Sequence, residues 1–536
     1  MIMDIFQSFF PIVWMMTIAR AEIFTSVAHL ENALYAERDI ARTLKNYIQR
    51  EEEKLEKLKS IADDMETHSA NALKDPVRYL ANPIGAFLFI KRFTLDWDRD
   101  VATILKDDKM HQVLLSEVEN SRQSLPNYED LAGVAAAFMR LQDTYQLDTT
   151  RLAEGDIHGR QISALTAESC FELARLSYVD GDYRHTIMWM ERTLDRLDRN
   201  QSDYKAKKLE ILDYMAFSMF KQGNLRHALS MTNELLIIDP SHERAQNNKR
   251  YYEQMIVEEE KKFGNRGDIG ETPIKNEPDV DEYRQSAEFR HYEALCRGEE
   301  VLEVQDQHRL RCRYYNNNKH PMLLIGPVKE EDVHISPKIV MYYDVLSDSE
   351  IEVIKSLAMP KLMRATIQNS KTGELETASY RVSKSAWLMT SDHPMIDKIC
   401  KRIEAISGLT LDTAEYLQVA NYGIGGHYEP HYDFARKEEK DAFKSLGTGN
   451  RIATWLNYMT DVELGGATVF PYIGVKVFPK KGAAAFWHNL YRNGEGIYDT
   501  RHAACPVLIG TKWVSNKWIH ERGQEFRRPC STNPEE

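Results

Sequence analysis

The stretch that decides the fold of the C-terminal part is Gly425-Gly426-His427-Tyr428-Glu429-Pro430-His431-Tyr432-Asp433. Alternate side chains of a β-strand share a face, so His431 and Asp433 are predicted to point the same way. An imidazole and a carboxylate on one face can hold one metal ion between them. His427 has the same parity, but the two glycines before it are expected to break the strand. We therefore expect His427 to support the ligands from outside the metal's coordination sphere or to be exposed.

A second histidine is needed to complete a facial set of ligands. His502, in Thr500-Arg501-His502-Ala503-Ala504, is the best candidate because a strand signal follows it at 506–509. Two histidines and one carboxylate leave adjacent coordination positions open, as a non-haem Fe(II) oxygenase requires for a chelating 2-oxo acid and O2. Zinc would favour a closed tetrahedron or one open position. The pattern predicts an iron site at His431, Asp433 and His502.

Lys512 follows His502 by ten residues, enough for the chain to return along an adjoining strand. An ammonium group deep in a barrel would pair with the far carboxylate of 2-oxoglutarate. The alternative is that Lys512 is a solvated strand residue like Lys517, and the nearby metal-binding pattern weighs against it. The residues that share its face by parity are Lys512, Val514, Asn516, Trp518 and His520.

The segment between the two ligand-bearing stretches contains further strand signals. Leu464-Gly465-Gly466-Ala467-Thr468-Val469-Phe470-Pro471 predicts a glycine turn that leads into a strand. Asp433 and His502 are 69 residues apart, with strands enough between them to close a double-stranded β-helix, or jelly roll. Upstream, the capping box Ser347-Asp348-Ser349-Glu350 predicts the start of a helix. We predict the catalytic domain over residues 331–536.

The middle of the chain carries an internal repeat at an offset of 42 residues. Gly181-Asp182-Tyr183 is echoed by Gly223-Asn224-Leu225, and the second copy ends at Pro240. Glycine at the turn and proline after the second helix are typical of tetratricopeptide repeats, whose stacked helices form a concave surface for peptides. We predict a tetratricopeptide-like peptide-binding domain over 158–257. A charged stretch rich in glycine and proline then predicts a linker region over 258–330.

Aromatic residues accompany this repeat. Tyrosine rings stack on proline rings, and proline-rich chains in polyproline II form lose little entropy when they dock. The alternative is that the rings fill the core between helices, and we expect exposure only for Tyr178, Tyr214 and Tyr251. The full set is Tyr178, Tyr183, Tyr214, Phe217, Phe220, Tyr251 and Tyr252.

Residues 1–21 hold an apolar run that ends in Ala19-Arg20-Ala21 and predict a cleaved signal peptide. A membrane anchor is the alternative, but the run is shorter than the ~20 apolar residues of a spanning helix. Apolar residues at three- and four-residue steps from Leu30 to Met65 then predict a long amphipathic helix, partly coiled coil, in an N-terminal helical domain over 22–157. That helix serves either an intramolecular bundle or self-association.

Charge and cysteine content restrict the partners and the compartment. The net charge of −13 argues against nucleic acid, because phosphate binding needs clustered Lys and Arg. Six cysteines fit an oxidising compartment. The sequence-local pairs are Cys296 with Cys312 and Cys505 with Cys530, which leaves Cys170 and Cys400 as buried thiols, although sequence alone does not choose among the pairings.

Two further signals concern the secretory lumen. The sequon Asn200-Gln201-Ser202 predicts a glycosylation site. The terminus Asn533-Pro534-Glu535-Glu536 is not a retention signal, so residence in the endoplasmic reticulum would depend on a partner.

In these motifs the chain resembles the catalytic α subunit of animal collagen prolyl 4-hydroxylases. The most specific parts are Glu429-Pro430-His431-Tyr432-Asp433-Phe434-Ala435-Arg436, the run Gly447-Thr448-Gly449-Asn450-Arg451-Ile452-Ala453-Thr454-Trp455, and residues 502–530. The resemblance implies a multidomain α+β protein. It implies iron ligands at His431, Asp433 and His502, 2-oxoglutarate bound by Lys512, and His520 near the oxo acid. It also implies the disulfides Cys296–Cys312 and Cys505–Cys530.

The resemblance further implies L-ascorbate as cofactor and protein disulfide isomerase as β subunit of an α2β2 tetramer in the lumen of the endoplasmic reticulum. Phe217 and Phe220 depart from the family, since they stand where members can carry tyrosine. His427 and Cys400 are also unexpected, and the sequence assigns them no role. The positions that match the family's peptide-binding residues are Tyr178, Asp213, Tyr214, Arg244, Asn248 and Tyr251.

The resulting expectation is an enzyme that forms 4-hydroxyproline in procollagen-like X-Pro-Gly peptides and releases succinate and CO2. One alternative is a lumenal adaptor that holds proline-rich clients while a decayed barrel serves as scaffold, and the intact His431, Asp433, His502 and Lys512 argue against it. Another is a related oxygenase that acts on a different secreted protein.

Overall fold

The computed structural model describes residues 23–74, 97, 99–106, 111–112, 114–116, 119, 126–161, 163–197, 204–263, 273–278, 281–302, 307–368, 375–439 and 442–533. The expected signal peptide and the sequon at Asn200 lie outside these residues. The chain forms two compact units, one containing Ala28–Asn127 and the other Phe24–Val27 together with Tyr128–Glu536. In the described part of the chain, no helix combines the length and apolarity needed to cross a membrane.

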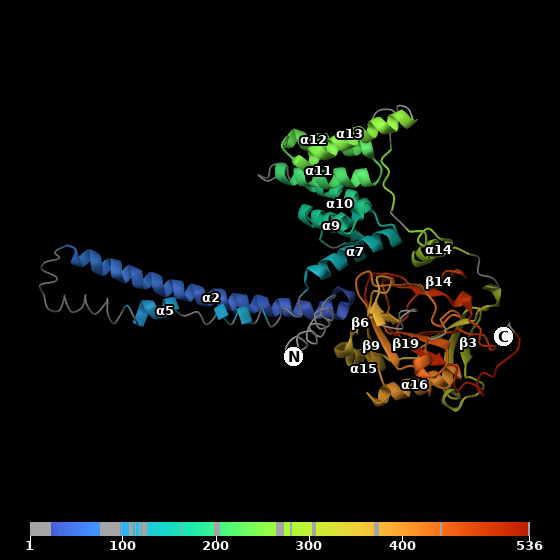
Figure 1. The fold of residues 1–536 in the computed structure, drawn as a ribbon. Coiled ribbons are helices and arrows are strands. Elements are labelled where there is room, and N and C mark those ends of the chain that lie inside the picture. The colour runs from blue at the N-terminus through green and yellow to red at the C-terminus, as the bar shows by residue number, and fades with distance from the viewer. Residues whose placement is uncertain are drawn as a thin grey trace, which may run out of the picture. The chain divides into compact units, whose positions relative to one another are not determined.

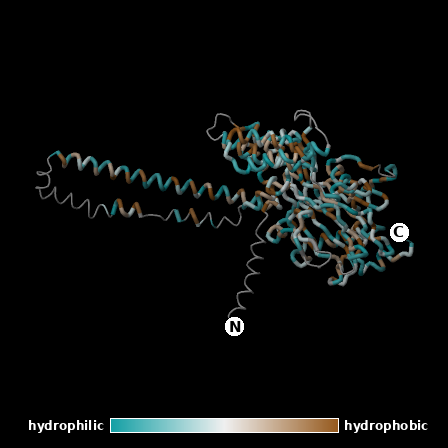
Figure 2. The backbone as a smooth tube through the Cα atoms, turned by 45° about the horizontal axis from the view of Figure 1, so that its top comes forward, coloured by the Kyte–Doolittle hydropathy of each residue, from teal (hydrophilic) through white to brown (hydrophobic). Residues whose placement is uncertain are grey.

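The first unit is dominated by helix α2, Val27–Ala72 (Figure 1). Hydrophilic and hydrophobic residues alternate along it (Figure 2). Charged side chains pair one turn apart, as Lys54 does with Glu51 at 2.8 Å. This confirms the predicted long amphipathic helix. The same unit contains the short helix α5, Thr103–Lys106.

The second unit begins with helices that lie inside the predicted N-terminal helical domain. Helix α7 (Tyr128–Tyr145), helix α8 (Thr149–Ala153) and strand β1 (Asp156–Ile157), which pairs with β2 (Arg160–Gln161), belong to this unit. The N-terminal domain predicted over 22–157 therefore spans both compact units. Its last helices lie in the second unit because α7 packs on the repeat helix α9, Ala167–Val179.

The repeat folds as two helix pairs and a fifth helix, which stack on one another in Figure 1. Gly181 and Gly223, at equivalent turns of the two copies, have φ of 82° and 83°, a left-handed conformation that glycine adopts without strain. The predicted tetratricopeptide-like repeat is confirmed. The helices are α9 (Ala167–Val179), α10 (Tyr183–Arg196), α11 (Tyr204–Lys221), α12 (Leu225–Ile238) and α13 (Glu243–Phe263).

The C-terminal part consists of two antiparallel sheets with helices α15 (Asp348–Ala358) and α16 (Pro394–Ser407). The capping box at Ser347 and Glu350 starts α15 as predicted. The larger sheet has the order β3 (Cys312–Tyr315), β4 (Val328–His334), β5 (Ile339–Tyr343), β16 (Ala484–His488), β12 (Arg451–Tyr458), β19 (Lys512–His520), β10 (Leu417–Tyr422), β9 (Lys384–Leu388) and β6 (Met363–Arg364). The smaller sheet has the order β11 (Tyr428–His431), β17 (His502–Ala504), β14 (Thr468–Phe470) and β15 (Val475–Val477). Two short pairs, β13 (Leu464–Gly465) with β18 (Val507–Ile509) and β7 (Thr366–Gln368) with β8 (Leu375–Thr377), complete the strands.

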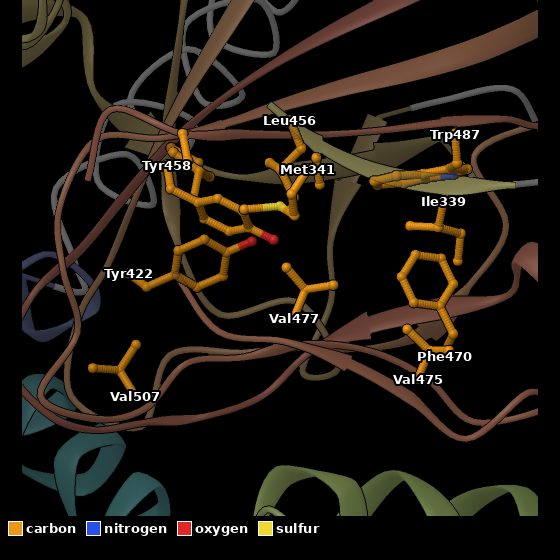
Figure 3. Close-up of a cluster of buried hydrophobic side chains, with 14 residues drawn as sticks. Ile339, Met341, Tyr422, Leu456, Tyr458, Phe470, Val475, Val477, Trp487 and Val507 are labelled. Carbon is orange, nitrogen blue, oxygen red and sulfur yellow. The ribbon is translucent and has the colours of Figure 1, made fainter. Parts of the chain in front are cut away.

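The core lies between the two sheets. Figure 3 shows Ile339 and Trp487 of the larger sheet facing Phe470 and Val475 of the smaller one. The rings of Trp487 and Phe470 meet edge to face with centroids 5.3 Å apart. Two antiparallel sheets that share one apolar interior confirm the predicted jelly roll.

The interval predicted as a linker, 258–330, is only partly one. Helix α13 continues to Phe263, β3 is the first strand of the larger sheet, and α14, Ala287–Cys296, packs on β14. Tyr292 and Leu295 of α14 are buried against the smaller sheet. Charged and glycine-rich flanks hid this short apolar helix, so the catalytic domain begins earlier than predicted.

The disulfide pairing differs from the expected one. Cys296, at the end of α14, is bonded to Cys505, just after β17, and neither Cys296–Cys312 nor Cys505–Cys530 forms. The two bonded cysteines meet in the buried contact between α14 and the smaller sheet, whereas Cys312 and Cys530 are exposed. Sequence proximity therefore predicted the wrong pairs. Cys170 and Cys400 are buried thiols, as predicted.

Candidate metal centre

His431 and His502 are cross-strand neighbours at the edge of the smaller sheet. The pairing of β11 with β17 places them opposite each other, with ring centroids 4.4 Å apart. Asp433 lies beyond the end of β11, so the prediction that it shares a strand face with His431 is wrong. The chain instead bends back, and its Oδ1 lies 3.8 Å from His431 Nε2 and its Oδ2 3.5 Å from His502 Nε2. The structure thus brings the three predicted side chains together, with one ligand atom of each within 4.8 Å of the others.

The ring orientations of both histidines suit a metal. Nδ1 of His431 donates to the Glu429 carbonyl at 2.8 Å, and Nδ1 of His502 donates to the Thr500 carbonyl at 2.9 Å. A carbonyl only accepts, so in each case the proton sits on Nδ1 and Nε2 presents its lone pair. Burial, together with the neighbouring His502, lowers the pKa of His431 well below its ordinary value. His431 is therefore neutral and ready to ligate at pH 7.

Asp433 is held as an oriented carboxylate. Its burial alone would raise its pKa, but His502, His431 and a hydrogen bond from Thr454 bring the pKa down to about 2. The Thr454 hydroxyl donates to Asp433 Oδ2 at 2.7 Å and accepts from Asn489 Nδ2 at 2.9 Å. The two imidazoles and one ionised carboxylate fit a divalent iron with open positions better than a closed zinc site.

Lys512 lies in the same pocket on the opposite wall. It begins β19 of the larger sheet, so the prediction that it occupies a strand adjoining His502 is wrong, because the chain crosses between the sheets. The side chain is 1% exposed, and its Nζ lies 5.0 Å from the centre of the Tyr422 ring. Burial lowers the pKa of Lys512 to about 7. A bound carboxylate would reverse that shift and keep the ammonium charged. Four of the five residues predicted to share one face line the pocket, namely Lys512, Val514, Asn516 and Trp518.

The lowered pKa of Lys512 predicts that the stability of the chain without metal and 2-oxoglutarate depends on pH. The unfolded lysine keeps its proton until about pH 10.4, whereas folded Lys512 releases it at about 7. Between these values the unfolded state binds more protons, so the free energy of unfolding should rise by up to ~1.4 kcal/mol per pH unit. Urea unfolding of the parent and of Lys512→Met across this range measures the difference. Equal pH slopes in the two proteins would contradict the assigned environment of Lys512.

Two other histidines lie apart from the metal ligands. His520 does not line the pocket, and its Nε2 lies 3.0 Å from Glu415 Oε1. His520 is the last residue of β19, and its Nδ1 lies 2.8 Å from the Gly449 carbonyl oxygen, so its ring makes its contacts outside the pocket. His427 is 1% exposed, so the alternative that it is exposed is wrong, and it is not part of the cluster of His431, Asp433 and His502.

The structure adds pocket residues that the sequence reasoning missed. Tyr428 stacks on His431 with ring centroids 3.5 Å apart, and the Arg381 guanidinium lies 4.8 Å from the Tyr428 ring. Both side chains line the pocket, as does Thr454. Tyr428 lies in the stretch Gly425–Asp433 that carries the metal-binding pattern, and Thr454 lies in the specific run Gly447–Trp455. Arg381 had no such signal, because its position follows only from the pairing of the chain near residue 381 with Tyr428.

The predicted peptide-binding residues lie on the repeat helices. The rings of Tyr178 and Tyr214 are 4.8 Å apart, and Arg244 pairs with Asp213 at 3.0 Å. Asn248 is half-buried on α13, where Tyr251 is 51% exposed. Consecutive ring contacts connect Phe171, Tyr214, Tyr178, Tyr183, Phe217, Phe220 and Tyr251.

The exposure of these rings departs in part from the expectation. Tyr251 is exposed, and Tyr178 and Tyr214 are half-buried. Tyr183, Phe217 and Phe220, expected in the core, are also half-buried, whereas Tyr252 is 1% exposed. Tyr183, Phe217 and Phe220 are partly exposed because they belong to one stripe of aromatic rings that runs across successive helices of the stack.

Comparison with known proteins matches three consecutive regions of the chain. Residues 26–159 match the N-terminal region of the prolyl 4-hydroxylase alpha-subunit, 167–258 the prolyl 4-hydroxylase peptide-substrate-binding domain, and 417–520 the 2OG-Fe(II) oxygenase superfamily. Prolyl 4-hydroxylase subunit alpha-1 of Homo sapiens is 47% identical over 521 residues, covering 96% of both chains. The same subunit of Gallus gallus is 49% identical, covering 95% of this chain and 99% of its own.

A solved viral collagen prolyl hydroxylase from Paramecium Bursaria Chlorella virus-1, in complex with 2OG, is 28% identical. The match covers 34% of this chain and 94% of that one, with a TM-score of 0.27. The identity to the alpha-1 subunits holds over nearly the whole length and includes all three matched regions. The chain therefore belongs to the prolyl 4-hydroxylase alpha-subunit family.

Proposed function

We propose that this chain hydroxylates proline at C4 in collagen-like X-Pro-Gly peptides, with Fe(II), 2-oxoglutarate and O2, and with L-ascorbate to keep the iron reduced. The observation that carries the proposal is the convergence of His431, Asp433 and His502 opposite the buried Lys512. It occurs in a chain whose relatives are prolyl 4-hydroxylase subunits.

Some pocket residues would bind the metal and 2-oxoglutarate, and other groups orient the metal ligands. His431, Asp433 and His502 would hold Fe(II), and Lys512 would bind the far carboxylate of 2-oxoglutarate. When bound, iron and 2-oxoglutarate together supply the O2 activation that an unactivated C–H bond requires, with release of succinate and CO2. The backbone carbonyls behind the two rings fix the imidazole planes, and Thr454 fixes the carboxylate of Asp433.

The helical repeat would hold the substrate while the pocket acts on it. Half-exposed tyrosine rings, Tyr178 and Tyr214 among them, offer flat faces to proline rings. The ion pair between Arg244 and Asp213 places charged hydrogen-bonding groups on the same helices. Peptide carbonyls in polyproline II form are free to accept such bonds.

Replacing an exposed ring should weaken peptide binding alone. We expect Tyr251→Ala to raise the KM for a long proline-rich peptide about tenfold, because a docked aromatic ring contributes ~1–2 kcal/mol. The KM for 2-oxoglutarate should not change. Tyr314→Ala is the matched control, because Tyr314 is also exposed, at 72%, but lies on β3. Steady-state kinetics with varied peptide measure both. An unchanged peptide KM in Tyr251→Ala would remove Tyr251 from the binding surface.

The assembly and the compartment form part of the proposal. A β subunit of protein disulfide isomerase would complete an α2β2 tetramer in the lumen of the endoplasmic reticulum. The Cys296–Cys505 bond supports an oxidising compartment. The sequon at Asn200 and the apolar N-terminal run support entry into that compartment.

Product analysis tests the function directly. The chain, purified with its partner subunit, is incubated with Fe(II), 2-oxoglutarate, ascorbate and a (Pro-Pro-Gly)-type peptide. We expect succinate release that depends on the peptide, and mass spectrometry should find one added oxygen on prolines that precede glycine. A lumenal adaptor would release no succinate with or without peptide. Succinate release without peptide oxidation would indicate an oxygenase for a different substrate.

A further inference from the structure

The loop at 423–426 joins β10, on the larger sheet, to β11, which ends at the ligand His431. Backbone from elsewhere approaches this loop so closely that side chains are excluded. A Cβ on Gly423 would lie 2.2 Å from the Phe24 carbonyl oxygen, and a Cβ on Gly425 would lie 3.0 Å from that of Ala137. Gly425 also has φ +58°, in the left-handed region that glycine favours. The glycines therefore mark a place where distant segments dock.

Hydrogen bonds hold the loop to these segments. The Gly423 amide donates to the Thr25 carbonyl at 3.0 Å, and the Arg140 guanidinium, on α7, donates to the Gly425 carbonyl at 3.0 Å. The segment around Thr25 is fully buried and belongs to the same compact unit as the oxygenase domain. It is tied to α7 in turn, because the Phe24 amide donates to Asp130 Oδ1 at 3.2 Å.

Helix α7 also forms a hydrogen bond with the chain near the second histidine ligand, His502. The Tyr145 hydroxyl, at the end of α7, donates to the Pro506 carbonyl at 2.6 Å, a few residues after His502. Two backbone hydrogen bonds join these two segments to each other. They connect Gly425 with Val507 at 3.2 Å and Gly426 with Val507 at 3.1 Å. Helix α7 thus donates hydrogen bonds to the chain near both histidine ligands, to the loop before His431 and to the segment after His502.

The opposite face of α7 belongs to the peptide-binding helices. Met139 is buried in one apolar cluster with Ala174 and Trp189. Gln142 donates to the Thr149 hydroxyl at 2.6 Å and accepts from the Trp189 indole at 3.2 Å. One helix is therefore shared between the core of the peptide-binding repeat and the edge of the metal site.

We propose that Arg140 and Tyr145, together with the segment 24–26, are positioning residues that set the separation of His431 from His502. They act through the loop at 423–426 and through 506–507, so the helix that supports the peptide-binding repeat also holds the metal ligands in register. None of these groups touches the ligands themselves. The inference rests on the proposed metal site.

Hydrogen exchange on the full-length, metal-free chain tests this positioning. The variants Arg140→Met and Tyr145→Phe remove the guanidinium and the phenolic hydroxyl that donate to these segments, and they keep most of the side-chain bulk. Each should speed amide exchange in 423–431 and 502–509 about tenfold, because a hydrogen bond that closes these segments is lost. Gln142→Leu is the matched control on the same helix. It should speed exchange in the repeat helices but not in 423–431.

Cobalt binding then tests the consequence for the metal site. Co(II), as a stand-in for Fe(II), should bind Arg140→Met and Tyr145→Phe roughly ten- to a hundredfold more weakly, with an altered visible spectrum, and should bind Gln142→Leu as the parent does. Unchanged exchange in 423–431, or equal loss of cobalt affinity in all three variants, would overturn the inference. Because exchange needs no metal, that failure is distinguishable from a parent chain that binds no Co(II), which would overturn the proposed function.

Discussion

Replacing Asp433 with alanine is expected to abolish proline hydroxylation while the chain stays folded. Asp433 is the single carboxylate of the candidate centre, and its loss leaves the two imidazoles to hold a divalent ion alone. A bound metal supplies several kcal/mol of transition-state stabilisation, so turnover should fall about a thousandfold or more. His431→Ala should behave alike. Peptide-dependent succinate release measures the effect, and circular dichroism of the metal-free proteins measures folding.

The control for this prediction is Asp461→Ala. Asp461 is an exposed carboxylate whose nearest cation, Lys480, lies 3.8 Å away, so its loss should leave turnover unchanged. Retained hydroxylation in Asp433→Ala, with metal content equal to that of the parent, would show that another side chain completes the centre.

Replacing Lys512 with methionine is expected to raise the KM for 2-oxoglutarate by about two to three orders of magnitude. Lys512 is fully buried, so without it a carboxylate bound at this position would have no ammonium to pair with and would remain desolvated. Leaving a buried charge unpaired costs ~3–5 kcal/mol. The peptide KM should change little, because the peptide would bind on the repeat helices. Kinetics with 2-oxoglutarate varied at saturating peptide measure the change.

Lys517 provides a matched control on the same strand. It is also buried, at 4% exposed, but it points to the other face and donates to the Glu415 carbonyl. Lys517→Met should leave the KM for 2-oxoglutarate near that of the parent. An equal rise in both variants would mean that the effect of Lys512 is structural and that the lysine does not bind the oxo acid.

Local patterns in the sequence predicted much of this site. Strand parity correctly placed Lys512, Val514, Asn516 and Trp518 on one face, because period-two alternation survives wherever a strand stays regular. The same rule failed for Asp433, which lies beyond the end of β11, and it did not reveal that His520, at the end of β19, lies outside the pocket. Parity carries no information about where regular structure stops.

Long-range contacts were the part that sequence could not supply. The Cys296–Cys505 bond joins residues 209 positions apart, and sequence proximity favoured nearer partners. Arg381 lies in the pocket because its segment pairs with Tyr428. No local feature of the sequence predicts that pairing. Helix α14 was hidden in a charged, glycine-rich interval because ten residues carry too little periodicity to identify a helix. In each case the determining partner lies far away along the chain.

The coupling between metal and 2-oxoglutarate binding tests the central claim most directly, that the three ligands and Lys512 share one pocket. Calorimetric titrations measure 2-oxoglutarate affinity with and without Co(II). We expect the metal to strengthen 2-oxoglutarate binding in the parent, the coupling to vanish in Asp433→Ala, and Lys512→Met to weaken binding in both conditions. Equal 2-oxoglutarate affinity with and without metal in the parent chain would contradict the account.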